Sequence, residues 1–260
     1  MTQKGQERVS LDLFEPYVED DDLHVESNVN ELQESDDSQT QAQCSSLQLN
    51  VRSGSSPTSR YLNTMKYPGP YGFQAVFLVQ PSRQRARSTE FSEKLNKLYI
   101  EMDKWVEVRL VLREWPQDRL FIRAVPVYAE AVDAVVPVIR CPHHSQPDHP
   151  TNIGFPHLQH LIRFDTDDAL YCEDLESGRL SVLAPLVPHQ DHSSSSLMMK
   201  FLCLGSDVGG PNRRPLQVVL TVEDGGAGVL GRDVVGVRIC CCPRRDRYSE
   251  EARIEREDSR

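Results

Sequence analysis

GVRICCCPRRDRYSEE, residues 236–251, predicts a strand, a sharp corner and a helix in direct succession. Every second position across 235–239 is a large aliphatic residue, while Arg238 and Cys240 fall on the opposite face of an extended chain. Pro243 ends the strand because it has no N–H to donate, and proline also suits the first turn of a helix. The strong helix formers that follow favour a helix beyond this corner.

The expected helix begins with an unusual arrangement of charge. The positive end of the helix dipole favours acidic residues, yet the first turn holds Arg244, Arg245 and Arg247 with Asp246 among them. A polyanion bound here would make the arrangement favourable, and arginine presented to a groove is a common way to read guanine. The alternative is an exposed face whose arginines are simply solvated.

Net charge restricts how the chain can meet a nucleic acid. The formal charge is -10, and residues 1–66 contribute 5 Lys+Arg against 12 Asp+Glu. This acidic balance excludes binding by bulk charge, so contact with DNA must come from a local patch. We find no apolar core for a signal peptide and no run of about 20 apolar residues, so the protein is expected to be soluble, with no membrane partner.

The composition divides the chain into an acidic segment and a folded domain. Residues 1–66 are rich in Ser, Gln, Asn and acids, which predicts a disordered N-terminal segment. Within it, VSLDLFEPYVEDDDL at 9–23 interleaves apolar and acidic residues, as a transactivation region that folds on a partner does. An acidic solubilising tail is the alternative. Residues 67–255 are expected to form the folded domain, followed by a tail at 256–260.

Short runs of β-branched residues separated by turn signals continue from Tyr67 to the corner at Pro243. This pattern predicts an antiparallel β-sandwich with one clear helix, at the C-terminus. Residues 91–112 are expected to form a short connection and then an alternating strand around 106–110. No phosphate-binding glycine loop or nucleophile elbow is found, so the sequence gives no support for nucleotide binding or hydrolysis.

Two close pairs of metal-binding residues lie far apart in the sequence. Cys141 and His144 are three residues apart, and Cys203 and Asp207 four. Such pairs are the usual construction of a tetrahedral zinc site. The remaining histidines of this region are expected to be loop or core residues rather than ligands: His143, His149 and His160.

Several motifs together resemble the DNA-binding domain of the p53 tumour-suppressor family of transcription factors. They occur in order over residues 67–255: RCPHH (140–144), QHLIR (159–163), GGPNRRP (209–215), LTVEDGGAGVLGRD (220–233) and VRICCCPRRDRYSEE (237–251). The resemblance implies an all-β, immunoglobulin-like antiparallel β-sandwich with large zinc-bridged loops and a C-terminal loop–sheet–helix motif that binds double-stranded DNA.

The resemblance also implies roles for individual residues. Three residues match zinc ligands of the family, and Asp207 stands where the family has a fourth cysteine, so one Zn²⁺ per chain is expected on Cys141, His144, Cys203 and Asp207. The positions that match DNA contacts are Arg85, Ser206, Arg213, Arg238, Cys242 and Arg245. Those that match supports of the DNA surface are Arg140, Gly210, Arg214 and Arg247.

Other positions depart from the family pattern on the same surface. Cys241 replaces a small residue, Arg244 a glycine, Tyr248 an arginine and Leu204 a polar residue. These changes are expected to retune base preference or to weaken binding.

The function implied is that of a nuclear, sequence-specific transcription activator, not an enzyme, acting in stress response, cell-cycle arrest and apoptosis, with a cytoplasmic pool. Its N-terminal segment would bind coactivators or a ubiquitin ligase. One alternative is an interaction protein that has lost productive DNA binding and titrates partners. Another is a metal-dependent hydrolase using Cys141, His144 and Asp207, but the sequence offers no clear general base.

Residues 252–260 have too few apolar positions for an oligomerisation seam. We therefore expect a monomer in solution and cooperative assembly of copies on adjacent DNA half-sites.

Overall fold

The computed structural model describes residues 62–79, 88–189, 194–225 and 228–259. The chain divides into two units, Met1–Ser35 and Asp36–Arg260, and all the described residues belong to the second. Arg85 and all but the end of the predicted N-terminal segment 1–66 lie outside the described residues.

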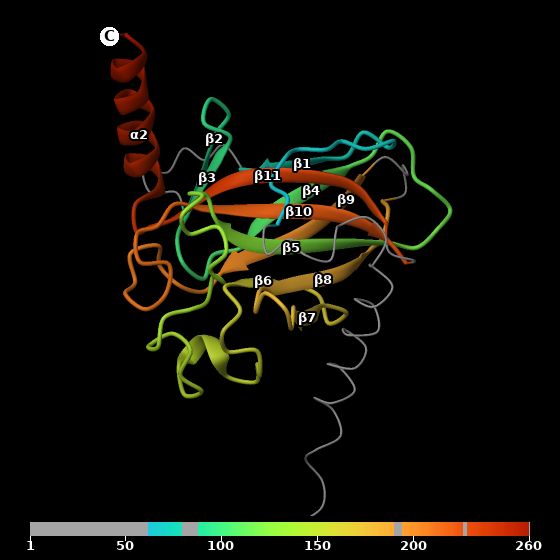
Figure 1. The fold of residues 1–260 in the computed structure, drawn as a ribbon, viewed down its shortest axis with the longest axis horizontal. Helices are drawn as coiled ribbons and strands as arrows, with labels where there is room; N and C mark the ends of the chain where they lie inside the picture. The colour runs from blue at the N-terminus through green and yellow to red at the C-terminus, as the bar shows by residue number, and fades with distance from the viewer. Residues whose placement is uncertain (1–61, 80–87, 190–193, 226–227, 260) are drawn as a thin grey trace, which may run out of the picture. The chain divides into compact units, whose positions relative to one another are not determined.

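The described part of the chain is built from two β-sheets and a C-terminal helix (Figure 1). The four-stranded sheet has the order β1 (Gln74–Leu78), β4 (Val106–Val111), β9 (Ser194–Phe201), β6 (Ile162–Phe164). The seven-stranded sheet has the order β2 (Thr89–Ser92), β3 (Lys97–Ile100), β11 (Val229–Ile239), β10 (Leu216–Asp224), β5 (Leu120–Tyr128), β8 (Leu180–Leu186), β7 (Leu170–Glu173).

One hydrophobic core joins the two sheets. It contains side chains from both layers, including Val108 and Met199 from the four-stranded sheet and Leu98, Leu220 and Val237 from the seven-stranded one. Alternation places these side chains inward, because successive residues of a strand point to opposite faces. The predicted β-sandwich is thereby confirmed.

Strand β11 carries the predicted alternation to its end. Val235, Val237 and Ile239 are buried, whereas Arg238 is exposed. β11 pairs antiparallel with β10, with Leu216 opposite Val237. Its other edge pairs in parallel with β3, with Lys97 opposite Gly236, so the larger sheet is mixed rather than purely antiparallel.

The prediction that only a short connection precedes the strand around 106–110 is wrong, because β2 and β3 form a hairpin over 89–100. Asn96 closes the turn at a positive φ of 47°. The strand β2 escapes a pattern search because its buried positions are polar: Glu90 is 4% exposed and Ser92 1%. Burial that depends on polar partners leaves no hydrophobic alternation in the sequence.

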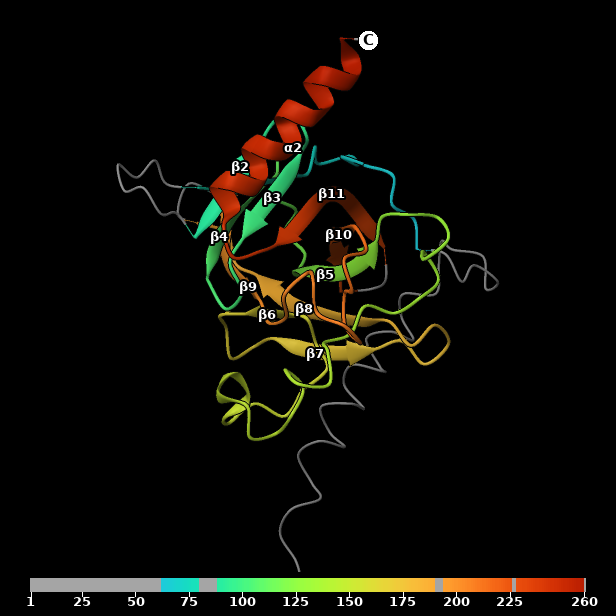
Figure 2. The ribbon, with the colours of Figure 1, turned by 90° about the vertical axis from the view of Figure 1, so that its left-hand side faces the viewer.

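Helix α2 (Pro243–Asp258) starts at the predicted proline and lies against β2 and β3 (Figure 2). Glu250 fixes it there, accepting from Lys97 Nζ at 2.6 Å and from the Tyr99 hydroxyl at 2.9 Å. Within the described ranges, no helix is long and apolar enough to cross a membrane.

Candidate metal centre and nucleic-acid interface

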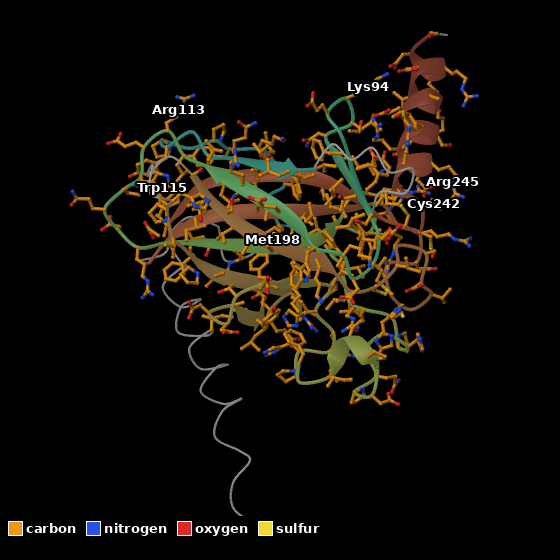
Figure 3. The ribbon with its side chains drawn as sticks, turned by 180° about the vertical axis from the view of Figure 1, so that it is seen from behind. Lys94, Arg113, Trp115, Met198, Cys242 and Arg245 are labelled. Atoms are coloured by element: carbon orange, nitrogen blue, oxygen red, sulfur yellow. The ribbon has the colours of Figure 1, made fainter. Side chains whose placement is uncertain are left out.

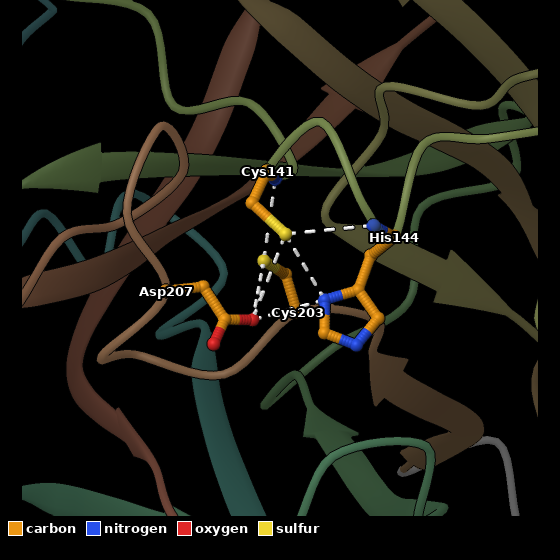
Figure 4. A group of neighbouring side chains, drawn as sticks. All are labelled: Cys141, His144, Cys203 and Asp207. Atoms are coloured by element: carbon orange, nitrogen blue, oxygen red, sulfur yellow. Dashed lines mark hydrogen bonds and ion pairs between the residues drawn. The ribbon is translucent and has the colours of Figure 1, made fainter.

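Cys141, His144, Cys203 and Asp207 converge although two loops far apart in the sequence supply them (Figure 4). Asp207 Oδ2 lies 2.9 Å from His144 Nδ1 and 3.2 Å from Cys203 Sγ. Cys141 Sγ lies 3.2 Å from His144 Nδ1. One ligand atom of each residue is within 4.8 Å of those of the other three. The structure thus brings together all four predicted ligands.

The donor set suits zinc. Two thiols, one imidazole nitrogen and one carboxylate oxygen are all accepted ligands of tetrahedral Zn²⁺. Burial lowers the pKa of His144, against the opposing charge of Asp207, and so favours the neutral imidazole that ligates metal. Burial raises the pKa of the Cys203 thiol, and a bound cation would reverse this by stabilising the thiolate.

The side chain of Arg140 forms several hydrogen bonds that hold the loop carrying Cys141 and His144. Its side chain is almost fully buried. Its guanidinium donates to Leu202 O at 3.0 Å, Asn152 Oδ1 at 2.7 Å and Thr151 Oγ1 at 2.9 Å. Burial lowers its pKa to about 10, which still leaves it charged at neutral pH. These bonds tie the loop to the chain just before Cys203.

Gly210 lies where the loop between Cys203 and Arg214 passes the loop that carries Cys141 and His144. A Cβ at this position would lie 2.8 Å from Cys141 N, so no larger residue fits without moving the metal centre. Arg214 holds the loop that contains Gly210 against Tyr128. It donates to Gly210 O at 3.1 Å, and its guanidinium stacks 3.7 Å above the ring of Tyr128.

The loop between Cys203 and Arg214 is anchored to the end of β11. Gly205 N donates to Ile239 O at 3.0 Å, and Arg213 N donates to Gly205 O at 2.7 Å. Arg213 adopts a positive φ of 62° and is exposed, as is Ser206. The geometry therefore presents a cation on a tight turn fixed beside the start of α2.

At the start of α2, Arg238 and Arg245 both form an ion pair with the carboxylate of Asp246. Arg238, with 52% of its side chain exposed, donates to Asp246 Oδ2 at 3.0 Å. Arg245, 74% exposed, donates through Nε and Nη2 to Asp246 Oδ1. Burial opposes ionisation of Asp246, but the hydrogen bonds from Arg245 and Arg238 outweigh it and hold its pKa below the ordinary value. Arg245 lies beside Cys242, the exposed N-cap of the helix (Figure 3).

Arg247 behaves differently from its exposed neighbours. It reaches Glu90 Oε2 at 3.2 Å on β2 and Glu251 at 3.1 Å within α2. It holds the helix to the hairpin, as an internal support would.

The residues expected to contact DNA therefore fall into one exposed group, apart from Arg85, whose position is not described. Sequence reasoning did not identify the partners that orient them. The sequence indicated Asp246 only as a charge that offsets the arginines. Its position between Arg245 and Arg247 was the one sign that it could also orient them. Asn152 and Thr151, which hold Arg140, gave no signal.

Comparison with known proteins gives a consistent result. The family model described as P53 DNA-binding domain matches residues 63–254. The protein named cellular tumor antigen p53 of Oncorhynchus mykiss is 37% identical over 206 residues, covering 78% of this chain and 52% of that protein. The proteins of the same name from Platichthys flesus and Tetraodon miurus are each 38% identical, over 75% and 72% of this chain and 52% and 50% of their own lengths. The chain spans about half the length of the curated relatives it matches.

Proposed function

This chain belongs to the P53 DNA-binding domain family, and from that premise we propose that it binds double-stranded DNA sequence-specifically and regulates transcription. The observation that carries the proposal is the exposed pair Arg238 and Arg245, oriented by the half-buried carboxylate of Asp246. Guanidinium groups fixed in this way are suited to phosphate and to the guanine edge. The role is one of binding and not of catalysis.

The individual contacts are those that the family resemblance implies, and the exposure of Ser206, Arg213, Arg238, Cys242 and Arg245 supports them. Arg245 stands at the helix start and would pair with a guanine in the major groove. Arg213, on its tight turn, would enter an adjacent narrow minor groove, whose negative potential attracts arginine. Arg238 and Ser206 would contact phosphates, and Cys242 a base edge. Arg85 would add a contact from its loop.

Zinc would be structural in this function. Cys141, His144, Cys203 and Asp207 fit one ion, which would join the two loops and so fix the position of Arg213. Arg140, Gly210, Arg214 and Arg247 would support the same surface without touching DNA. Their contacts, described above, run between loops and elements.

The wider biology follows the family. The protein would act in the nucleus, with a cytoplasmic pool, as an activator in stress response, cell-cycle arrest and apoptosis. Residues 1–66 would bind coactivators or a ubiquitin ligase. Copies of the domain would assemble cooperatively on paired half-sites, where sharing a duplex raises their effective concentration.

The decisive test compares Arg245→Ala with Arg253→Ala, a matched loss of one exposed arginine farther along α2. Affinities are measured for a selected specific duplex and for a scrambled one. We expect Arg245→Ala to cost about 1–3 kcal/mol on the specific duplex and to relax discrimination at one base pair. Arg253→Ala should leave discrimination intact.

Wild-type protein that binds both duplexes equally would refute sequence-specific binding. That result would favour the alternative, a protein that titrates partners without productive DNA binding.

A further inference from the structure

Three imidazoles of one loop gather beside the four-residue cluster of Cys141, His144, Cys203 and Asp207. The ring centroids of His143 and His144 are 5.1 Å apart, those of His143 and His149 5.3 Å, and those of His144 and His149 5.0 Å. One ring nitrogen of each lies within 4.8 Å of those of the other two. Nitrogens bound to a single tetrahedral zinc are about 3.4 Å apart, so side-chain movements of about 1 Å would complete a site.

Hydrogen bonds already hold the loop that carries these rings. His149 Nδ1 lies 2.9 Å from Thr151 Oγ1, which also accepts from Arg140 at 2.9 Å. Asn152 Nδ2 donates to the carbonyl oxygen of His144 at 2.9 Å. Metal-binding histidines commonly use their second ring nitrogen in such a hydrogen bond, which sets the ring orientation. Thr151 N also donates to His149 Nδ1 at 3.3 Å, so an ion at His149 Nε2 needs the tautomer in which Nδ1–H donates to Thr151 Oγ1 instead.

Access and donor type restrict the ion. His143 is exposed, so an ion can arrive from solvent, and water can occupy a remaining position. A set made of imidazole nitrogens suits zinc, copper and nickel, whereas calcium and magnesium prefer oxygen. The sulfur-containing cluster next to it offers a different ligand set, so the two are distinguishable by spectroscopy.

We propose that His143, His144 and His149 form a second transition-metal site of nitrogen ligands and water, adjoining the four-residue cluster. His144 Nδ1 faces Cys141 and Asp207, while its other ring nitrogen points away from them (Figure 4). His144 can therefore bind one ion through Nδ1 and a second through its other ring nitrogen. The proton on that nitrogen would then be released to solvent. Because His144 is shared and because the two cations repel each other, the second ion binds more weakly than the first.

The second ion would act on the loop rather than on DNA. By joining His143 to His149, it would close the turn between them. That turn carries His144, so the second ion would also slow escape of the first. This inference is independent of whether the chain binds DNA, although it uses the same loop.

Titration of the metal-free 260-residue chain with Co²⁺ tests the proposal. Thiolate ligands give a sulfur-to-cobalt charge-transfer band in the near ultraviolet, and nitrogen ligands do not. We expect that band to saturate at about one equivalent, while visible d–d absorption continues to rise to about two equivalents. If the four-residue cluster failed to bind metal, the charge-transfer band would be missing but the nitrogen-type absorption would remain.

Two variants, His143→Asn and His149→Asn, should lower the total from about two ions to about one and leave the charge-transfer band unchanged. His157→Asn is the matched control, because it lies on the same loop but belongs to neither cluster. Thermal unfolding of the metal-free variants verifies that each still folds. Saturation of the wild type at one ion, or retention of the second ion by both variants, would overturn the proposal.

Discussion

Asp246 Oδ1 accepts two hydrogen bonds from Arg245, from Nε at 3.1 Å and from Nη2 at 3.0 Å. The other carboxylate oxygen is occupied by Arg238 at 3.0 Å. Only 11% of the Asp246 side chain is exposed, so the acid is held while the arginines extend from it. One half-buried anion thus sets the directions of two exposed cations, which reduces the entropy lost when they bind a ligand.

Asp246→Asn should therefore separate specific from non-specific DNA binding. The amide keeps the volume but presents donors to the guanidinium groups, so affinity for a specific duplex should fall by about 1.5–3 kcal/mol. Affinity for scrambled DNA should hold or rise, because one negative charge near the phosphates is removed. Fluorescence anisotropy with both duplexes measures this. Glu257→Gln, which removes a remote charge of α2, should change neither; equal losses on both duplexes would refute the orienting role.

Arg238→Ala should weaken binding to all sequences alike. A phosphate contact contributes through released counterions, so the slope of log K against log salt should become shallower by about 0.9. Arg253→Ala should keep the wild-type slope. An unchanged slope for Arg238→Ala would show that this residue contacts no phosphate.

Asp207→Cys should tighten zinc binding. Thiolate is a softer donor than carboxylate, so we expect affinity to rise by roughly tenfold in a competition with a chromophoric chelator. Without metal the same variant should melt earlier, because Asp207 Oδ2 accepts from Leu204 N at 3.0 Å and a thiol replaces this bond poorly. A variant with unaltered zinc affinity would place Asp207 outside the coordination sphere.

Glu250 should make the domain sensitive to acid. Burial opposes its ionisation, but Lys97 and Tyr99 outweigh it and hold its pKa below the ordinary value. A depressed folded-state pKa gives stability that is present above the unfolded value, near 4, and lost as pH falls through the folded one.

Glu250→Gln should cost about 1–3 kcal/mol in urea unfolding near neutral pH. The difference from wild type should shrink in acid, where the wild-type carboxyl is protonated. Glu255→Gln, on the more exposed pair with Lys94, should cost little. A difference that stays constant down to acid pH would contradict the assignment.

Features that depend on local pattern were predictable. Alternation before Pro243 predicted the end of β11 and the start of α2. Two short spacings predicted the four residues that converge as the candidate metal centre. Features that depend on polar contacts between residues far apart in the sequence could not be predicted. Strand β2 has a polar buried face, which resembles a loop in sequence. Asp246 can pair with both Arg238 and Arg245 only because the chain turns between β11 and α2. The rings of His143 and His149 come close only because of the turn that Asn152 and Thr151 hold.

The parallel pairing of β3 with β11 has a consequence for synthesis of the chain. Elements emerge from the ribosome in order, so β3 appears long before the strand that completes its edge. β5 likewise pairs with β8 while its other edge waits for β10. Unpaired edges recruit strands from other molecules, and non-local pairings form slowly. The nascent domain is therefore most exposed to aggregation before β10 and β11 emerge, and the pairing of these two strands ends that interval.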